Sequence, residues 1–289
     1  MAIRNIPDTL TKKNSRILIY VGLACLLYLG LTAYWNWYGP YGEDYGPYII
    51  QDLITLLPAV AAAVLGSILL HQFNRGDKPR RIWFWFVAGW WAWVGGEISF
   101  TMYDILHIPG GQLSVYDIFW TAGYLCFGLS LFFQFRHIYM PQRRSGLVSY
   151  LLAVALALLA SLGLTLWAHS AGLGQDMSWF ALYLAVFYPV CDIVEGVFAL
   201  WLAFVFGRGN WGRPWWGLIA FAFADAINIF LWIGGYDLLP EKWTNFLDPL
   251  SNTIYNGGYV VVMVGFLVIL LLNFWSAPSS QAPIPESGD

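Results

Sequence analysis

Eight apolar runs of about twenty residues, separated by short polar segments, restrict the fold of this chain more than any other feature. Each run is long enough to cross a hydrocarbon core of about 30 Å as an α-helix. With 59% hydrophobic and 11% charged residues, the chain also cannot hide its apolar surface in a water-soluble globule. The sequence therefore predicts an all-α, polytopic membrane helix bundle of eight transmembrane helices, and it excludes a secreted enzyme or a cytosolic module. The expected spans are 17–35, 48–73, 82–102, 115–135, 147–167, 179–206, 215–233 and 249–274.

The basic residues are distributed unevenly between the two ends of these spans. All of the fourteen Lys and Arg residues except Lys242 fall before the first span or in the segments that join spans two and three, four and five, and six and seven. Lys and Arg accumulate on cytoplasmic loops, so both termini are expected in the cytoplasm of a bacterial cell, with the bundle in its inner membrane. This topological grouping and a net charge of only −3 leave no argument for a nucleic-acid partner.

Shifting the chain by 133 residues aligns its two halves. Arg75-Gly76 then falls on Arg208-Gly209, Trp83 on Trp216, and Tyr103-Asp104 on Tyr236-Asp237. Slightly different shifts place Pro58 on Pro189 and Gly123-Tyr124 on Gly258-Tyr259. Four spans return the chain to its starting side, so the halves are expected to be parallel four-helix repeats related by an axis along the membrane normal. The expected organisation is a cytoplasmic tail (1–15), a first repeat (16–145), a second repeat (146–275) and a disordered cytoplasmic tail (276–289).

Acidic residues inside the spans are the first candidates for a functional site, because a carboxylate in hydrocarbon is costly. At about 1.5 Å per residue, Asp225 lies about 15 Å into span seven, and Asp192 and Glu195 lie about 20 Å into span six. Asp192 and Glu195 are three residues apart and share a helix face, as do Asp225 and Asn228. In the first half, Glu97 is placed comparably, in the outer part of span three. Asp52, Asp104 and Asp117 are expected close enough to the outer surface to be wetted.

No basic residue of the predicted topology is near these acids, so we expect them to lack ion pairs and to share at least one proton. Two interpretations follow. The cluster either binds a cation, a proton or an amine, or it only fixes helix packing through hydrogen bonds. The residues predicted to bind a ligand are Asp192, Glu195, Asp225, Asn228, Tyr188 and Tyr255.

Metal and cofactor sites are not expected. The three cysteines, Cys25, Cys126 and Cys191, lie in apolar runs without metal-type spacing, and the four histidines fall at span ends. No zinc motif, phosphate loop or nucleophilic triad is present.

Short motifs in both halves resemble the multi-pass N-terminal sensor regions of bacterial diguanylate cyclases and histidine kinases. In the first half they are the Trp90 to Glu97 stretch, the 108–114 turn, and Asp117-Ile118-Phe119-Trp120 with Gly123-Tyr124; in the second they are Tyr188-Pro189, Asp192, Asp225, Asp248 and Gly258-Tyr259. The resemblance implies a membrane sensor region covering most of spans two to eight. Because no kinase or cyclase domain follows span eight, we expect a stand-alone form.

A weaker resemblance links the chain to the small membrane-bound terpene cyclases, in which a Trp-Glu pair and a later Asp act as acids. Glu97 is similar to the first acid, with Gly96 in place of the Trp, and Asp225 loosely corresponds to the second. This likeness implies acid-initiated cyclisation of a lipid-soluble substrate, with Glu97, Asp192 or Asp225 as the proton donor.

These observations favour a sensor-like or accessory membrane subunit that recognises an apolar or cationic ligand within its bundle. The expected partners are membrane lipids, together with another membrane protein or an apolar small molecule. A membrane-embedded cyclase or isomerase and a small carrier are the alternatives.

Overall fold

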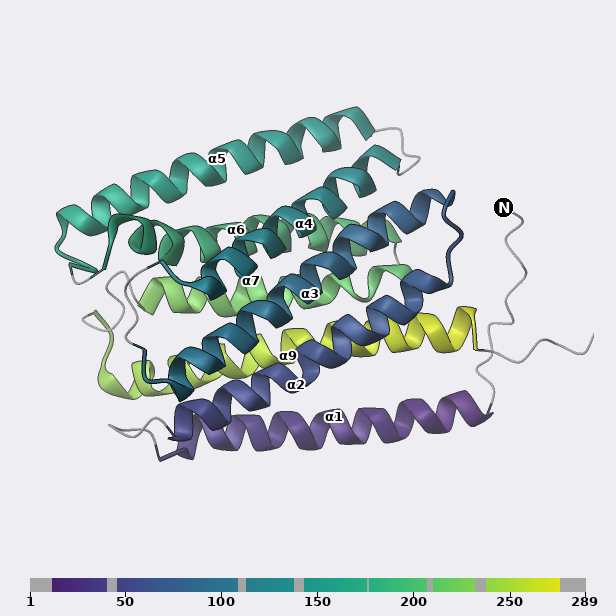
Figure 1. Ribbon diagram of the computed structural model, residues 1–289, viewed down its shortest axis with the longest axis horizontal. Helices are drawn as coiled ribbons and strands as arrows, with labels where there is room; N and C mark the ends of the chain where they lie inside the picture. The colour runs from purple at the N-terminus through teal and green to yellow at the C-terminus, as the bar shows by residue number, and fades with distance from the viewer. Residues whose placement is uncertain are drawn as a thin grey trace, which may run out of the picture.

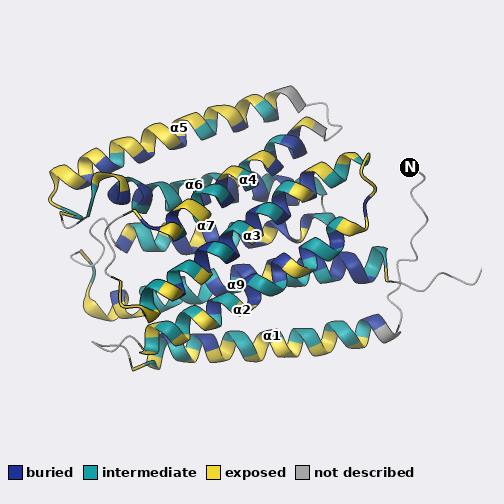
Figure 2. Ribbon diagram, in the orientation of Figure 1, coloured by how far each residue is buried: buried dark blue, intermediate teal, exposed yellow. Residues whose placement is uncertain are grey.

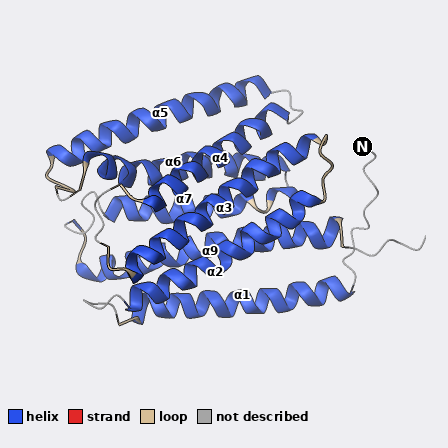
Figure 3. Ribbon diagram, in the orientation of Figure 1, coloured by secondary structure: helices blue, strands red, loops and turns tan. Residues whose placement is uncertain are grey.

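The structure is a computed structural model that describes residues 12–40, 46–108, 113–137, 143–175, 177–206, 210–231 and 238–275. Across these ranges the chain forms eight α-helices and a short 3₁₀ helix, with no strand (Figure 3). The predicted all-α fold is therefore confirmed. The two expected tails fall outside the described residues except for 12–15. The elements are α1 (Lys12–Tyr38), α2 (Gly46–His71), α3 (Lys78–Ile105), α4 (Val115–His137), α5 (Arg143–Ser170), α6 (Trp179–Phe206), η1 (Asn210–Gly212), α7 (Trp215–Phe230) and α9 (Glu241–Asn273).

Six of these helices, α1, α2, α4, α5, α6 and α9, are long and apolar enough to cross a membrane. Helix α3 has 28 residues, which corresponds to a length of about 42 Å. It carries Lys78, Arg80 and Arg81 in its first turn, and Glu97 and Asp104 in its second half. Helix α7 is apolar and shorter, with 16 residues. Its helical backbone continues at Leu231, and residues 232–237 lie outside the described part of the chain. The helices thus form a polytopic membrane bundle.

One helix begins well before its predicted span. Helix α9 starts at Glu241, whereas the apolar pattern places the span start at 249. Pro249 lies inside the helix, and the first two turns before it are mostly polar. The pattern of apolar residues therefore missed these turns, which are helical but not apolar. The helix begins after Pro240 at the N-cap, and the negative charge of Glu241 in the first turn interacts favourably with the helix dipole.

Helices α1 and α5 lie at the two opposite edges of the bundle (Figure 1). Exposed positions are concentrated on these two helices, whereas α3, α6, α7 and α9 carry most of the buried positions (Figure 2). In the apolar window of α1 only 6% of the residues are buried inside the protein, against 61% for α9. Large exposed leucines along α1 and α5, such as Leu26, Leu27, Leu156 and Leu159, fit a surface that faces lipid.

The contacts between helices recur in the two halves. The pairs α1–α2, α2–α3 and α3–α4 have counterparts in α5–α6, α6–α7 and α7–α9. Across the halves, α2 contacts α9 while α6 contacts α4, and α1 contacts α9 while α5 contacts α4. The specific equivalence of Tyr103-Asp104 with Tyr236-Asp237 lies outside the described residues.

The segments that carry the basic residues gather at one end of the bundle. At this end, the Asn14 side chain donates to the Leu271 carbonyl over 3.0 Å, and the Phe73 ring lies 5.9 Å from Trp211 and 6.0 Å from Phe274. The single remaining Lys, Lys242, belongs to the opposite end, where the first turns of α9 meet the end of α1. Lys242 is thus separated along the bundle from the other basic segments.

Helices α3 and α4 are locked together by two reciprocal contacts between an indole ring and a glycine. Trp93 of α3 lies against Gly123 of α4, and Trp120 of α4 lies against Gly96 of α3, so closely that a Cβ atom at either glycine would clash with the ring. Small residues at helix interfaces allow such close approach in membranes. The α3–α4 pair forms one wall of the bundle interior, where the predicted acids lie.

Candidate functional site

Helix α6 brings two of the predicted acids, Asp192 and Glu195, into the bundle interior, where both are buried. The next residue, Gly196, allows α6 to approach α7 closely, because a Cβ atom at this position would clash with the Cβ atom of Ala222. Asp225 lies one turn beyond Ala222 on α7. The close helix contact therefore places Asp225 against Asp192.

Asp192 is only 1% exposed and has one strong hydrogen-bond donor, the Tyr124 hydroxyl of α4, at 2.5 Å from Oδ2. The Asp225 carboxyl also lies within hydrogen-bonding reach of Asp192. Within the described residues, however, Asp192 Oδ1 has no hydrogen-bond donor. Two ionised carboxylates offer only acceptors. Their contact therefore requires either a proton or a cation between them.

Asn228 completes this group on α7. It lies beside Asp225, and its Oδ1 accepts a hydrogen bond of 2.6 Å from the Ser251 hydroxyl of α9. The structure thus brings together three of the predicted ligand-binding residues, Asp192, Asp225 and Asn228, at the junction of α6, α7 and α9. We refer to Asp192, Asp225, Asn228 and Tyr124 as the central cluster.

Glu97 occupies a separate position on α3. It is buried, and its Oε1 accepts a hydrogen bond of 2.8 Å from the Tyr259 hydroxyl of α9. The Trp120 indole lies beside it, although its Nε1 has no hydrogen-bond partner among the described residues. Glu97 therefore depends on a tyrosine from the other half of the chain, as Asp192 does.

The two tyrosines that hold these acids were missed as site residues in the sequence. Tyr124 and Tyr259 each follow a glycine, in the Gly-Tyr pairs that recur in the two halves. Tyr124 comes from the first half and donates to an acid of the second, whereas Tyr259 comes from the second half and donates to an acid of the first. The repeated Gly-Tyr pair was the available signal, but the sequence does not say which acid each hydroxyl meets.

Tyr255 lies between the two acid positions, in the electrostatic neighbourhood of Glu97, Asp225 and Asp192. Its ring centroid is 4.7 Å from Phe221, 5.7 Å from Tyr259 and 6.5 Å from Trp93, with which it is stacked. The space between the central cluster and Glu97 is thus walled by aromatic rings.

Tyr188 belongs to a different site. Its hydroxyl donates to Asp117 Oδ1 over 3.0 Å, and Asp117 Oδ2 accepts from the Ser114 backbone N–H at 2.9 Å and from the Ser114 hydroxyl at 2.6 Å. The bond from Ser114 N–H to a carboxylate three residues later is half of a capping box. Tyr188 and Asp117 therefore fix the start of α4, and Tyr188 reaches the central cluster only by stacking on Tyr124 at 5.6 Å.

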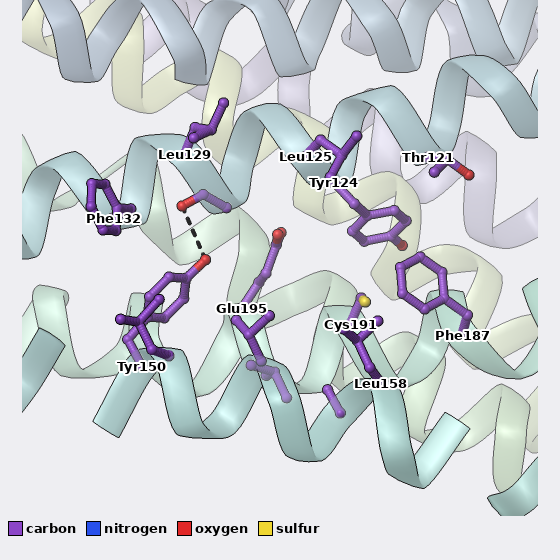
Figure 4. A pocket seen from close by; sticks show the side chains of 15 residues that line it. Thr121, Tyr124, Leu125, Leu129, Phe132, Tyr150, Leu158, Phe187, Cys191 and Glu195 are labelled. Carbon is purple, nitrogen blue, oxygen red and sulfur yellow. Dashed lines mark hydrogen bonds between the residues drawn. The ribbon is translucent and has the colours of Figure 1, made fainter. Parts of the chain in front are cut away.

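Glu195 lines a cavity of about 320 Å³ between α4, α5 and α6, whose wall includes Tyr124 but not Asp192, Asp225 or Asn228. Its carboxyl points into the space between Tyr150 and Tyr124 (Figure 4). Tyr150 and Cys191 are its polar neighbours. Within the part of the chain that the structure describes, Glu195 Oε2 has no hydrogen-bond partner. The other side chains of the cavity wall are almost all apolar.

The charged surroundings of these acids contain only other acids. No Lys, Arg or His side chain of the described ranges is among the neighbours that act on Glu97, Asp192, Glu195 or Asp225. The same ranges contain no group of three His, Cys, Asp or Glu residues arranged to hold a metal ion. The arrangement is suited to holding a proton or an organic cation.

Comparison of this chain with protein-family models, with curated proteins and with solved structures finds no significant match. The functional inference therefore rests on the acids, the tyrosines and the cavity described above.

Proposed function

We propose that this chain is a membrane-embedded recognition subunit, sensor-like or accessory, which responds to an apolar or cationic ligand or to a membrane partner through its helix bundle. The observation that carries the proposal is Asp192. This buried acid is held by Tyr124 from the other half of the chain, it lies beside Asp225, and its Oδ1 has no donor among the described residues. Intramembrane acids of this kind commonly mark sites of ligand or proton recognition.

The position of the acids suggests how recognition becomes a signal. Both tyrosine hydrogen bonds join one half of the chain to the other. A cation or proton that arrives between Asp192 and Asp225 changes the charge that Tyr124 meets, and with it the strength of this link. A ligand that favours one arrangement of the halves then shifts the population toward it. The proposal therefore includes the two parallel repeats as the moving units.

The proposed location is the inner membrane of a bacterium, with both termini in the cytoplasm. Its support is the gathering of the basic segments at one end of the bundle and the resemblance to membrane sensor regions. Cysteine labelling in intact cells tests it. Positions in 73–81 and 137–146 should be protected from an impermeant reagent, and positions in 39–45 should react. Labelling of both groups from the same face would contradict the proposal.

The recognition proposal is tested by purifying the chain from its host membrane in lipid nanodiscs and identifying small molecules in an organic extract by mass spectrometry. Wild type should retain a molecule that Asp192→Asn loses while remaining folded. Glu241→Gln, which removes an exposed acid at the start of α9, is the matched control and should retain the molecule. If the extracts of wild type, Asp192→Asn and Glu241→Gln are identical, Asp192 serves only in helix packing.

The two alternatives predict different results with the same preparation. An acid-catalysed cyclase or isomerase that uses Glu97, Asp192 or Asp225 would convert a component of a lipid extract, and a carrier would move a solute into liposomes. The cavity between α4, α5 and α6 is lined by Glu195 and by none of these three acids, so it offers no substrate space beside the proton donors that the enzyme alternative needs.

A further inference from the structure

The cavity between α4, α5 and α6 has a polar inner end and an apolar outer end. Glu195, Tyr124, Tyr150 and Ala157 are buried, with Glu195 5% exposed. At the outer end, Leu125 of α4 and Leu158 of α5 are 67% and 46% exposed. Helix α5 packs mainly on α6 and only sparsely on α4. The cavity is therefore open toward lipid between α4 and α5.

No hydrogen-bond donor of the described residues reaches Glu195 Oε2. The two hydroxyls that line the cavity near the carboxyl are already used as donors. The Tyr150 hydroxyl donates to the Gly128 carbonyl at 3.0 Å (Figure 4), and the Tyr124 hydroxyl donates to Asp192 at 2.5 Å. Cys191, the third polar neighbour, is a weak donor. The missing partner of Glu195 is thus a hydrogen-bond donor from outside the chain.

A positively charged nitrogen satisfies this acceptor best. Hydrogen bonds between charged partners are about twice as strong as neutral ones, and the cavity contains no cation among the described residues to compete. The Tyr124, Tyr150 and Phe187 rings in the wall also favour a cation near their faces. The volume of about 320 Å³ is at the lower end of the range for small-molecule sites.

We propose that this cavity binds an amphiphilic amine, whose apolar body enters from the lipid between α4 and α5 and whose ammonium group meets Glu195. Glu195 is the seventeenth residue of α6, about 24 Å along a helix of about 42 Å. The ammonium group therefore sits near the middle of the membrane, at the inner end of the cavity. The inference rests on the proposed function, because it names the ligand class of a recognition site.

The test uses the purified chain in phosphatidylcholine nanodiscs, with dodecylamine as the probe and dodecanol as a matched neutral probe. Native mass spectrometry and the unfolding temperature report binding. Dodecylamine should form a one-to-one adduct and raise the unfolding temperature, whereas dodecanol should bind at least about tenfold more weakly, since a neutral head group loses the charge-assisted bond. Equal binding of the two probes, or no adduct with dodecylamine, would overturn the inference without any variant.

Three variants locate the site. Glu195→Gln keeps the shape of the side chain and should weaken dodecylamine binding at least about tenfold. Ala157→Phe fills the cavity, leaves Glu195 in place and should abolish the adduct. Glu241→Gln changes an exposed acid outside the cavity wall and should bind as wild type does. Binding that survives either of the first two changes would place the amine elsewhere.

The same set of proteins separates this inference from the proposed function. If dodecylamine binding fails while Asp192→Asn loses a co-purified molecule, the amine class is wrong and the recognition role stands. If dodecylamine binds at Glu195 while Asp192→Asn and wild type give identical extracts, the site is real and the role assigned to the central cluster is wrong. Addition of phosphatidylethanolamine tells whether a lipid head group or a free amine occupies the site, because only a lipid occupant would displace the probe.

Discussion

Asp192 and Glu195 lie one turn apart on the same face of α6, yet they meet different surroundings. Asp192 faces α4 and α7, where a tyrosine and a second acid contact it, whereas Glu195 faces an apolar cavity at the α4–α5 side. A shared helix face therefore did not mean a shared site. The neighbouring helices decide the chemistry, because α7 approaches α6 closely at Gly196 and α5 packs only sparsely against α4.

The largest effect is expected from separating α6 and α7. Gly196→Ala places a Cβ atom against Ala222 and the Leu218 carbonyl, so we expect a loss of about 2.5 kcal/mol in unfolding free energy through overpacking. Gly163→Ala on α5 is the matched control, since nothing lies within 4 Å of its Cβ position. Thermal unfolding in detergent measures both. Equal stability of the two variants would contradict the close contact that brings Asp225 to Asp192.

A smaller effect should follow from removing the hydroxyl that Asp192 uses. Tyr124→Phe should cost about 1.5 kcal/mol, near the upper end of side-chain hydrogen bonds between membrane helices. Tyr150→Phe removes a neutral bond to the Gly128 carbonyl and should cost about 0.6 kcal/mol, the average for such bonds. Unfolding measurements of both variants rank the two sites. A larger loss of unfolding free energy in Tyr150→Phe than in Tyr124→Phe would contradict this ranking.

Asp225→Asn should change stability by less than about 1 kcal/mol, because an amide can donate to Asp192 where a protonated carboxyl would. Under the recognition proposal the folded variant nevertheless loses function. The double variant with Asp192→Asn gives the coupling between the two side chains, which should be measurable because they are in contact. Additive effects of the two changes would argue that the carboxyls do not share a proton or cation.

The smallest change in unfolding free energy is expected at Glu195, where the substitution should stabilise the protein. Glu195→Leu replaces a buried carboxyl that has no described partner by an apolar group, and it should stabilise the protein by about 0.5 kcal/mol. Asp192→Leu should destabilise it, since Tyr124 and Asp225 lose their partner. Chemical unfolding of the two variants measures both effects. Destabilisation by Glu195→Leu would show that the Glu195 carboxyl makes a hydrogen bond that stabilises the fold.

The sequence predicts the helical membrane bundle because apolar run length is a direct signal of membrane crossing. It also identifies the interior acids, since a carboxyl in an apolar run is conspicuous. The partners of these acids were not predictable. Asp192 meets Tyr124 across 68 positions in the sequence and Glu97 meets Tyr259 across 162, and helical spacing carries no information about such distant contacts.

The position of Tyr188 and the cavity beside Glu195 also could not be predicted from the sequence. Tyr188, one turn before Asp192, was grouped with the central cluster by spacing, but its hydroxyl bonds to Asp117 at the start of α4. The cavity beside Glu195 left no trace in the sequence, because it results from the loose packing of α5 against α4 and not from the identity of any residue.

The reciprocal contacts of Trp93 with Gly123 and of Trp120 with Gly96 also restrict which motions are open to the bundle. Sliding α3 along α4 would move each indole off its glycine toward the residues one turn away on the same face, all of which are bulkier than glycine. Both indoles would have to leave together, so α3 and α4 behave as one rigid body. Helix α5, at the edge of the bundle, has no such lock on α4. Opening the lipid-facing side of the cavity is therefore a movement of α5 alone, and a cross-link between α4 and α5 should trap an amine already inside.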